Sequence, residues 1–291
     1  MILVCGMNNN GQLDKNKCEI LNPGSKLMVD PKSIKSYSVL SDHSVFITNE
    51  GTGVANGENT GCLINPSLPT RNVLNYDFSI KANMVQKNII SALCGWHYTL
   101  YLILKTEGRN IHAYTYEGMQ SSNFISISVK NSNPIAFFGG GDNCVSIDSN
   151  GRITYIPKII YNSMPSSYHI TSLPKNEKAI SVSYYDELII ALSSSGRVYM
   201  SKNVESFNPT FSEVYKLKNI HIVNISGGFT HAFAVSNDGK VYGIGINYFS
   251  KLGLSKDIEK VEDFVQILSL SRYKILEAYA GRHHSLFRTS Q

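Results

Sequence analysis

Residues 227–247 read GGFTHAFAVSNDGKVYGIGIN, and this stretch predicts a β-hairpin. Ala232 to Val235 is a short apolar run rich in residues that favour strands. The segment Asn237-Asp238-Gly239 predicts a tight turn, because a glycine after aspartate accepts the positive φ that such turns need. Val241 and Tyr242 then resume the strand.

The same pattern recurs along the whole chain. In most copies an anchor residue stands eight residues before a turn glycine, as His231 stands before Gly239. The anchors are His43, Tyr98, Asn143, Leu188, His231 and His284, and successive anchors lie 43 to 55 residues apart. One unit cannot bury its own apolar face, so neighbouring units must stack. Short strands and turns at this period are typical of a β-propeller. The sequence therefore predicts an all-β fold, a single six-bladed propeller over residues 1–291.

The two ends of the chain predict how the ring closes. The last unit has its first hairpin strand, from His284 to Arg288, but no second one. Residues 2–8 form an orphan second strand, which aligns with the best copy so that Gly6 falls on Gly245. We expect residues 1–14 to complete the last blade, which removes the exposed strand edges that favour aggregation.

Bulk properties exclude several classes of protein. The net charge of +5 is spread without a run of five Lys or Arg, so no nucleic-acid partner is expected. Five cysteines without a CxxC pair predict free thiols in a reducing compartment rather than disulfides or a zinc site. No apolar run approaches the ~20 residues of a membrane span, and the N-terminus lacks a signal-peptide pattern. We expect a monomer of the cytoplasm or nucleus, without a transmembrane segment.

Few residue clusters suggest bond-making chemistry. The glycine-rich segments 139–141 and 243–245 precede no helix pattern, so they do not predict a phosphate loop. Four histidines could in principle gather around a metal: His97, His231, His283 and His284. No carboxylate accompanies them at regular spacing, and we interpret the repeat-position histidines 43, 231 and 284 as hydrogen-bonded to backbone within or between blades. Because no nucleophile motif stands out either, we expect no catalytic residue, no metal, no cofactor and no enzyme.

The loops just before the anchors should all open on one face of the ring. They combine aromatic residues with arginine, the composition of interface hot spots. An alternative stays open, in which Trp96 and Phe229 pack between blades. The candidates for partner binding are Asp42, Trp96, His97, Asp142, Tyr184, Tyr185, Asp186, Phe229, Arg282 and His283.

The repeat resembles that of the regulator of chromosome condensation family. The pattern Gly-x-x-His, an apolar strand, Asp-Gly-x-Val-Tyr and Gly-x-Asn-x-x-x-x-Leu-Gly runs from Gly228 to Gly253. Partial copies lie in residues 2–13, 95–102 and 281–287. The resemblance implies a β-propeller that serves as a rigid binding platform. Members of the family usually have seven blades, whereas this sequence contains six units.

The resemblance also implies a partner. The founding member of the family is a guanine-nucleotide exchange factor for the nuclear GTPase Ran, so we expect this chain to bind a Ras-superfamily small GTPase and to promote exchange. Exchange requires only that an inserted loop or acidic group disturb the phosphate and Mg²⁺ site of the partner. The long connection 65–88 and the loop acids Asp42, Asp142 and Asp186 are candidates for that role.

A scaffold without exchange activity is the alternative. Other members of the family bind ubiquitin-pathway partners, chromatin or membranes, and some bacterial pathogens deliver such proteins into host cells. The alternative function is therefore a platform for a ubiquitin-pathway, cytoskeletal or membrane-associated partner, for example as an effector in a host cell. The modest, unclustered charge disfavours chromatin and lipid.

Overall fold

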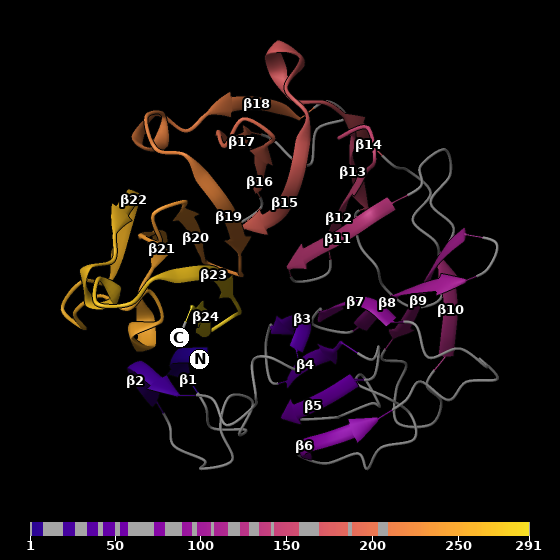
Figure 1. Ribbon diagram of the computed structural model, residues 1–291, viewed down its shortest axis with the longest axis horizontal. Helices are drawn as coiled ribbons and strands as arrows, with labels where there is room; N and C mark the ends of the chain where they lie inside the picture. Colours follow the sequence, from indigo (N-terminus) through magenta and orange to yellow (C-terminus); the bar gives the residue numbers. More distant parts are fainter. Residues whose placement is uncertain are drawn as a thin grey trace.

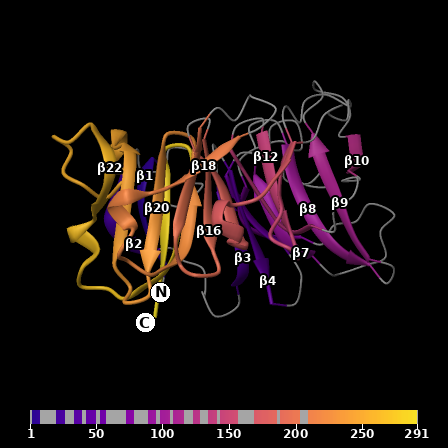
Figure 2. The same cartoon turned by 90° about the horizontal axis from the view of Figure 1, so that it is seen from above.

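The strands form six four-stranded antiparallel sheets around a common centre (Figure 1). Seen from the side, the strands run roughly along the axis of the ring (Figure 2). The computed structural model describes residues 2–7, 20–26, 34–39, 43–49, 53–57, 73–78, 89–94, 98–105, 108–115, 123–127, 134–140, 143–156, 169–185, 188–202 and 209–290. Among these residues the number of sheets equals the number of repeat units counted in the sequence.

The sheets follow one another along the chain, and in the first five the strands run in sequence order from the centre of the ring outward. The first contains β3 (Ile34–Val39), β4 (His43–Thr48), β5 (Gly53–Gly57) and β6 (Val73–Phe78). The second contains β7 (Ile89–Cys94), β8 (Tyr98–Lys105), β9 (Gly108–Thr115) and β10 (Asn123–Ile127). The third contains β11 (Pro134–Gly140), β12 (Asn143–Asp148), β13 (Ile153–Ile156) and β14 (His169–Thr171).

The other three sheets belong to the second half of the chain, and the last of them is completed by the N-terminus. The fourth contains β15 (Ala179–Tyr185), β16 (Leu188–Ser193), β17 (Val198–Lys202) and β18 (Thr210–Glu213). The fifth contains β19 (Ile222–Gly227), β20 (His231–Ser236), β21 (Val241–Ile246) and β22 (Lys260–Gln266). The sixth contains, from the centre outward, β23 (Ile275–Ala280), β24 (His284–Thr289), β1 (Ile2–Met7) and β2 (Ile20–Lys26). Short 3-10 helices occupy some connections: η3 (Pro174–Asn176), η4 (Tyr215–Leu217), η5 (Tyr248–Ser250) and η6 (Leu268–Leu270).

Each of the six anchors is the first residue of the second strand of its sheet. The loops before the anchors therefore all follow the carboxyl end of an inner strand, and we call the face that carries them the anchor face. The opposite face, where the inner strands begin, also carries the ends of β1 and β24, because Ile2 pairs with Arg288. We call it the terminal face; the two chain termini lie side by side there (Figures 1 and 2).

The predicted pairing of the N-terminal strand with the last unit is confirmed. β1 runs antiparallel to β24, from the Ile2–Arg288 pair to the Gly6–His284 pair. Gly6 and Gly245 share a φ of +105°, and Gly245 likewise pairs with an anchor histidine, His231. A side chain on Gly6 would overlap the backbone of His283 and His284, which explains the glycine at this position. Residues 8–14 of the predicted closing segment lie outside the described residues.

The hairpin turns form for the reason that the sequence suggests. Gly151, Gly196 and Gly239 have φ between 78° and 86°, and each donates its N–H to the residue that ends the preceding strand. In the last of these turns the hydroxyl of Ser236 accepts a hydrogen bond from the N–H of Lys240 at 3.1 Å. This local bonding makes each hairpin a robust unit.

The core lies between neighbouring sheets. In the cluster that joins the fifth and sixth sheets, the rings of Phe233 and Phe287 meet edge to face at 5.0 Å. Leu3 and Cys5 of β1 are buried in the same cluster. Burying each phenylalanine contributes roughly 1.5–3 kcal/mol. Because Leu3 and Cys5 pack in the same cluster, β1 is held by packing as well as by its hydrogen-bonded ladder.

Two further observations concern the cysteines and the possibility of a membrane-crossing helix. Cys5 and Cys144 are buried and take part in no disulfide. Within the described ranges, no helix has the length and apolar character needed to cross a membrane.

Candidate functional site

Phe229, Arg282 and His283 lie on the anchor face, and only part of this face is described. Asp42, Trp96, His97, Asp142 and Asp186 lie outside the described residues, as does most of the connection 65–88 apart from β6. The backbone of Tyr185 pairs with Leu188 at the end of β15. The two fully described loops, residues 228–230 and 281–283, meet at the junction of the fifth and sixth sheets.

The structure contradicts one candidate, Tyr184. Its side chain is only 7% exposed, and its ring stacks on that of Tyr155 at 6.4 Å. It belongs to the cluster between the third and fourth sheets. Tyr184 therefore packs in the core between these two sheets.

Phe229 and Arg282 come together across the blade junction. The guanidinium carbon of Arg282 lies 5.5 Å from the centre of the Phe229 ring, an arrangement that favours a cation–π interaction. The N–H of Phe229 donates to the carbonyl of Gly281 at 3.2 Å, so the two loops are joined through their backbones. A side chain on Gly228 would overlap that carbonyl, which explains the glycine. The side chains of Phe229 and Arg282 remain partly exposed.

His283 lies next to Arg282 in the chain and reaches toward the connection that follows β21. Its ring meets Phe249 of η5 edge to face at 5.5 Å, and Tyr248 beside it is exposed. Phe249 and Ser250 hold left-handed φ values of 61° and 53°, which are uncommon for residues other than glycine.

The side chain of Asn247 organises that connection. Its amide donates to the carbonyls of Ser255 at 2.9 Å and Ile258 at 2.8 Å, while its carbonyl accepts from the N–H of Leu252 at 3.0 Å. These bonds explain the spacing of Asn and Leu in the repeat motif, since the asparagine folds the chain so that Leu252 enters the core.

Lys251 lies beneath the two loops that carry Phe229 and Arg282. The sequence did not predict this buried lysine. The side chain is 1% exposed, and its ammonium donates to the hydroxyl of Thr230 at 2.6 Å and to the carbonyl of Arg282 at 3.0 Å. Burial, assisted by the charge of Arg282, lowers the pKa of Lys251 from 10.5 to about 8. The only sequence signal is that the aligned N-terminal copy has an uncharged residue, Gln12, at this position.

A second buried polar group links the same blades. The Nε2 atom of His231 and the hydroxyl of Ser285 form a hydrogen bond of 2.7 Å. Ser285 in turn donates to the carbonyl of Lys251 at 2.6 Å. Burial holds the pKa of His231 well below 6.5, so its imidazole is neutral in the folded protein at neutral pH. The sequence predicted that this histidine hydrogen-bonds to backbone within or between blades, and the structure adds a side-chain hydroxyl of the neighbouring blade as a partner.

The described part of the anchor face thus offers binding chemistry. A guanidinium, an imidazole and two phenylalanine rings gather at one blade junction, above a buried ammonium that ties the two loops together. Such groups recognise carboxylates, carbonyls and aromatic surfaces of another protein.

Comparisons with known proteins agree with the repeat and the fold. Residues 222–250 match the Regulator of chromosome condensation (RCC1) repeat. Over 75 residues the chain is 33% identical to the ultraviolet-B receptor UVR8 of Arabidopsis thaliana, a match that spans 26% of this chain and 17% of the receptor.

Two solved structures share the fold across the whole chain. Human WBSCR16 superposes with a TM-score of 0.70 at 15% identity, covering 99% of this chain and 82% of its own. Prp20p from Saccharomyces cerevisiae superposes with a TM-score of 0.67 at 14% identity, covering 99% of this chain and 91% of its own. The repeat match and these structures confirm the resemblance drawn from the sequence.

Proposed function

We propose that this chain, whose residues 222–250 match the Regulator of chromosome condensation (RCC1) repeat, is a protein-binding propeller whose anchor face holds a small GTPase of the Ras superfamily. One observation carries the choice of face. Arg282 lies over Phe229, and His283 contacts Phe249, on loops of two adjacent blades. Partly exposed arginine and aromatic side chains on a rigid support favour a protein hot spot.

The choice of a GTPase rests on the family. The founding member exchanges the nucleotide of Ran, and the structural study of Prp20p, which has the same fold, concerns its binding to Gsp1p and histones. Identity of 14% carries the fold alone, so the GTPase is a proposal for this chain.

Exchange would follow from binding energy rather than from bond chemistry. A protein that binds the nucleotide-free form of a GTPase more tightly than the loaded form displaces the nucleotide by mass action. In this chain Phe229 and Arg282 would supply contact, while Lys251 fixes the two loops from below by its bonds to Thr230 and Arg282. Asp42, Asp142 and Asp186 remain the proposed acids for the partner's phosphate and Mg²⁺ site.

Capture of purified GTPases tests the proposal. Immobilised chain is offered a panel of Ras-superfamily members, Ran included, each nucleotide-free, GDP-bound and GTP-bound. We expect one member to be retained best in its nucleotide-free state, and we expect Phe229→Ala and Arg282→Ala to weaken retention about tenfold or more. Tyr215→Ala is the matched control, since Tyr215 is 81% exposed on the terminal face. Retention of no member, or equal retention by the loop variants, would exclude this site.

A further inference from the structure

All six inner strands begin with the same irregularity. In each, the pairing with the second strand skips the second residue of the inner strand, as it does between Ile222 and Asn224. A skipped residue is a β-bulge, which turns a side chain out of the ladder. The skipped residues are Lys35, Ile90, Ile135, Ile180, Val223 and Leu276.

Five of these six residues are aliphatic, and those described are exposed or partly exposed. Ile180 and Val223 are each 47% exposed and Ile135 is 37% exposed, while Leu276 is intermediate. Lys35 occupies the same bulge in the first sheet and is exposed. Because the fold accepts a lysine at this position, folding alone does not explain the aliphatic residues at the other bulges.

These residues lie close to the axis of the ring. The inner strands surround the centre, and the bulges stand where these strands begin, on the terminal face (Figure 1). We call Ile135, Ile180, Val223 and Leu276 the aliphatic collar. It lies at the opposite end of the inner strands from the anchor loops, so the two faces can be occupied independently.

The surface around the collar is cationic. Three described connections lead into β15, β19 and β23, and we call their residues 173–178, 214–221 and 268–274 the rim. The rim contains six cationic side chains and one carboxylate: Lys175, Lys178, Lys216, Lys218, Arg272, Lys274 and Glu177. Lys178 and Lys274 each stand two residues before a collar residue.

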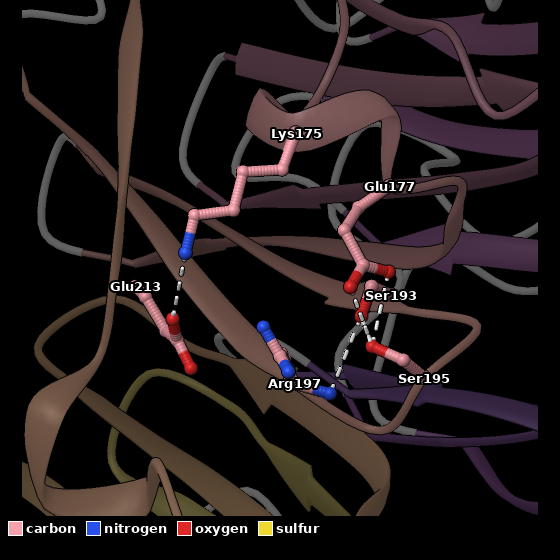
Figure 3. A network of polar contacts seen from close by, with 6 residues as sticks. All are labelled: Lys175, Glu177, Ser193, Ser195, Arg197 and Glu213. Carbon is pink, nitrogen blue, oxygen red and sulfur yellow. Dashed lines mark hydrogen bonds and ion pairs between the residues drawn. The ribbon is translucent and has the colours of Figure 1, made fainter.

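Little of this positive charge is neutralised within the chain. Among the described residues, Lys175 is the one rim cation with an ion pair, to Glu213 at 3.8 Å. Glu177 accepts hydrogen bonds from the hydroxyl of Ser195 at 2.8 and 3.0 Å (Figure 3). The rim therefore presents a surplus of positive charge, which attracts acidic partners over about a Debye length.

We propose that the terminal face docks an acidic protein segment that inserts a bulky apolar side chain into the aliphatic collar. The charge of the rim matches carboxylates on the segment, and the half-exposed collar matches a bulky apolar side chain. A duplex would find phosphate contacts but no partner for the aliphatic side chains, which neither stack on bases nor bond to them. A flat bilayer is a poor match as well, because the collar side chains are half covered by their own strands.

A fluorescent peptide tests the proposal directly. The probe is a peptide of about 12 residues, acidic throughout except for a central leucine–phenylalanine pair. The reference probe has the same length and charge without the pair. We expect fluorescence anisotropy to show about tenfold tighter binding of the first probe, and binding that weakens as salt rises from about 50 to about 200 mM.

Variants separate the collar from the rim. The double variant Ile180→Lys/Val223→Lys should lose about tenfold in affinity, with an unchanged unfolding midpoint because Lys35 already occupies such a bulge. Val265→Lys, at a 36% exposed valine of the outer strand β22, is the matched control. Lys178→Glu/Lys274→Glu should weaken binding and flatten its salt dependence. Lys35→Ile should tighten binding, because it adds a sixth aliphatic residue to the ring of bulges.

Several results would overturn the proposal. Equal affinity for the two peptides would show that the collar takes no part in binding. Full affinity in a folded Ile180→Lys/Val223→Lys variant would show the same. If that variant does not fold, unchanged affinity in both Lys35→Ile and the rim variant would be decisive instead. Tighter binding to phosphatidylserine-containing vesicles or to duplex DNA than to the peptide would assign the face to a different class of partner. Capture of a GTPase on the anchor face should be unaffected by any of these variants.

Discussion

Replacement of Lys251 by glutamine should change how stability depends on pH. A pKa of about 8 instead of 10.5 means that the protonated side chain costs about 3 kcal/mol more in the folded protein than in the unfolded chain. Because the folded pKa is the lower one, the unfolded chain binds the extra proton between pH 8 and 10.5, and stability rises with pH in that window. The wild type should gain about 2 kcal/mol between about pH 7 and 9.5, and the Lys251→Gln variant should not.

Urea unfolding of the two proteins over this pH range measures the effect. The relevant quantity is the difference between their free energies of unfolding at each pH. Burial raises the pKa of Cys5 to about 12, so ionisation of the unfolded thiol opposes the gain above pH 9. Cys5 is present in both proteins, and its contribution cancels in the difference. Glutamine is the conservative replacement, because Gln12 stands at the aligned position of the N-terminal copy.

An exposed lysine of the same connection provides the control. Lys256→Gln, five residues along the chain, should leave the pH dependence of the wild type unchanged, because Lys256 is exposed. A constant difference between wild type and Lys251→Gln from about pH 7 to 9.5 would refute the reasoning. It would mean that burial does not lower the pKa of Lys251 in solution.

Three further predictions concern the same blade junction. Gly228→Ala should destabilise the protein by about 1–3 kcal/mol, measured as a lower urea midpoint, since the new methyl group overlaps the carbonyl of Gly281 and lies 3.0 Å from Ala280. Gly6→Ala should cost at least as much, because its φ of +105° disfavours any side chain; a midpoint equal to that of the wild type would argue against β1 as the closing strand. His231→Gln should lose less stability than the wild type as pH falls below 6.5, because the folded pKa of His231 is lowered and the unfolded chain gains the proton first; parallel acid titrations of the two proteins would contradict this.

The sequence predicted the hairpins well because they are local. The turn glycines and the apolar run before each of them place the second strand of five sheets, and all six anchors begin that strand. The equivalence of Gly6 and Gly245 also followed from alignment alone, and the pairing of β1 with β24 confirms it.

The contacts between blades were less predictable. Val182, Ser183 and Tyr184 are all buried in β15, so the alternation that marks an exposed strand face is absent there, and Tyr184 was wrongly placed on the surface. No local pattern indicates that Lys251 is buried, because its burial depends on loops 21 and 31 residues away. The bulges depend on strand register, which the sequence does not specify.

Release of a fluorescent guanine nucleotide shows whether the chain acts on a small GTPase. Each GTPase of the panel is loaded with the nucleotide, and its release is followed with and without a stoichiometric amount of the chain. We expect faster release from one member, and slower release when Phe229 or Arg282 is replaced by alanine. No acceleration for any member, together with no retention of any member in any nucleotide state, would contradict the claim that the anchor face binds a small GTPase.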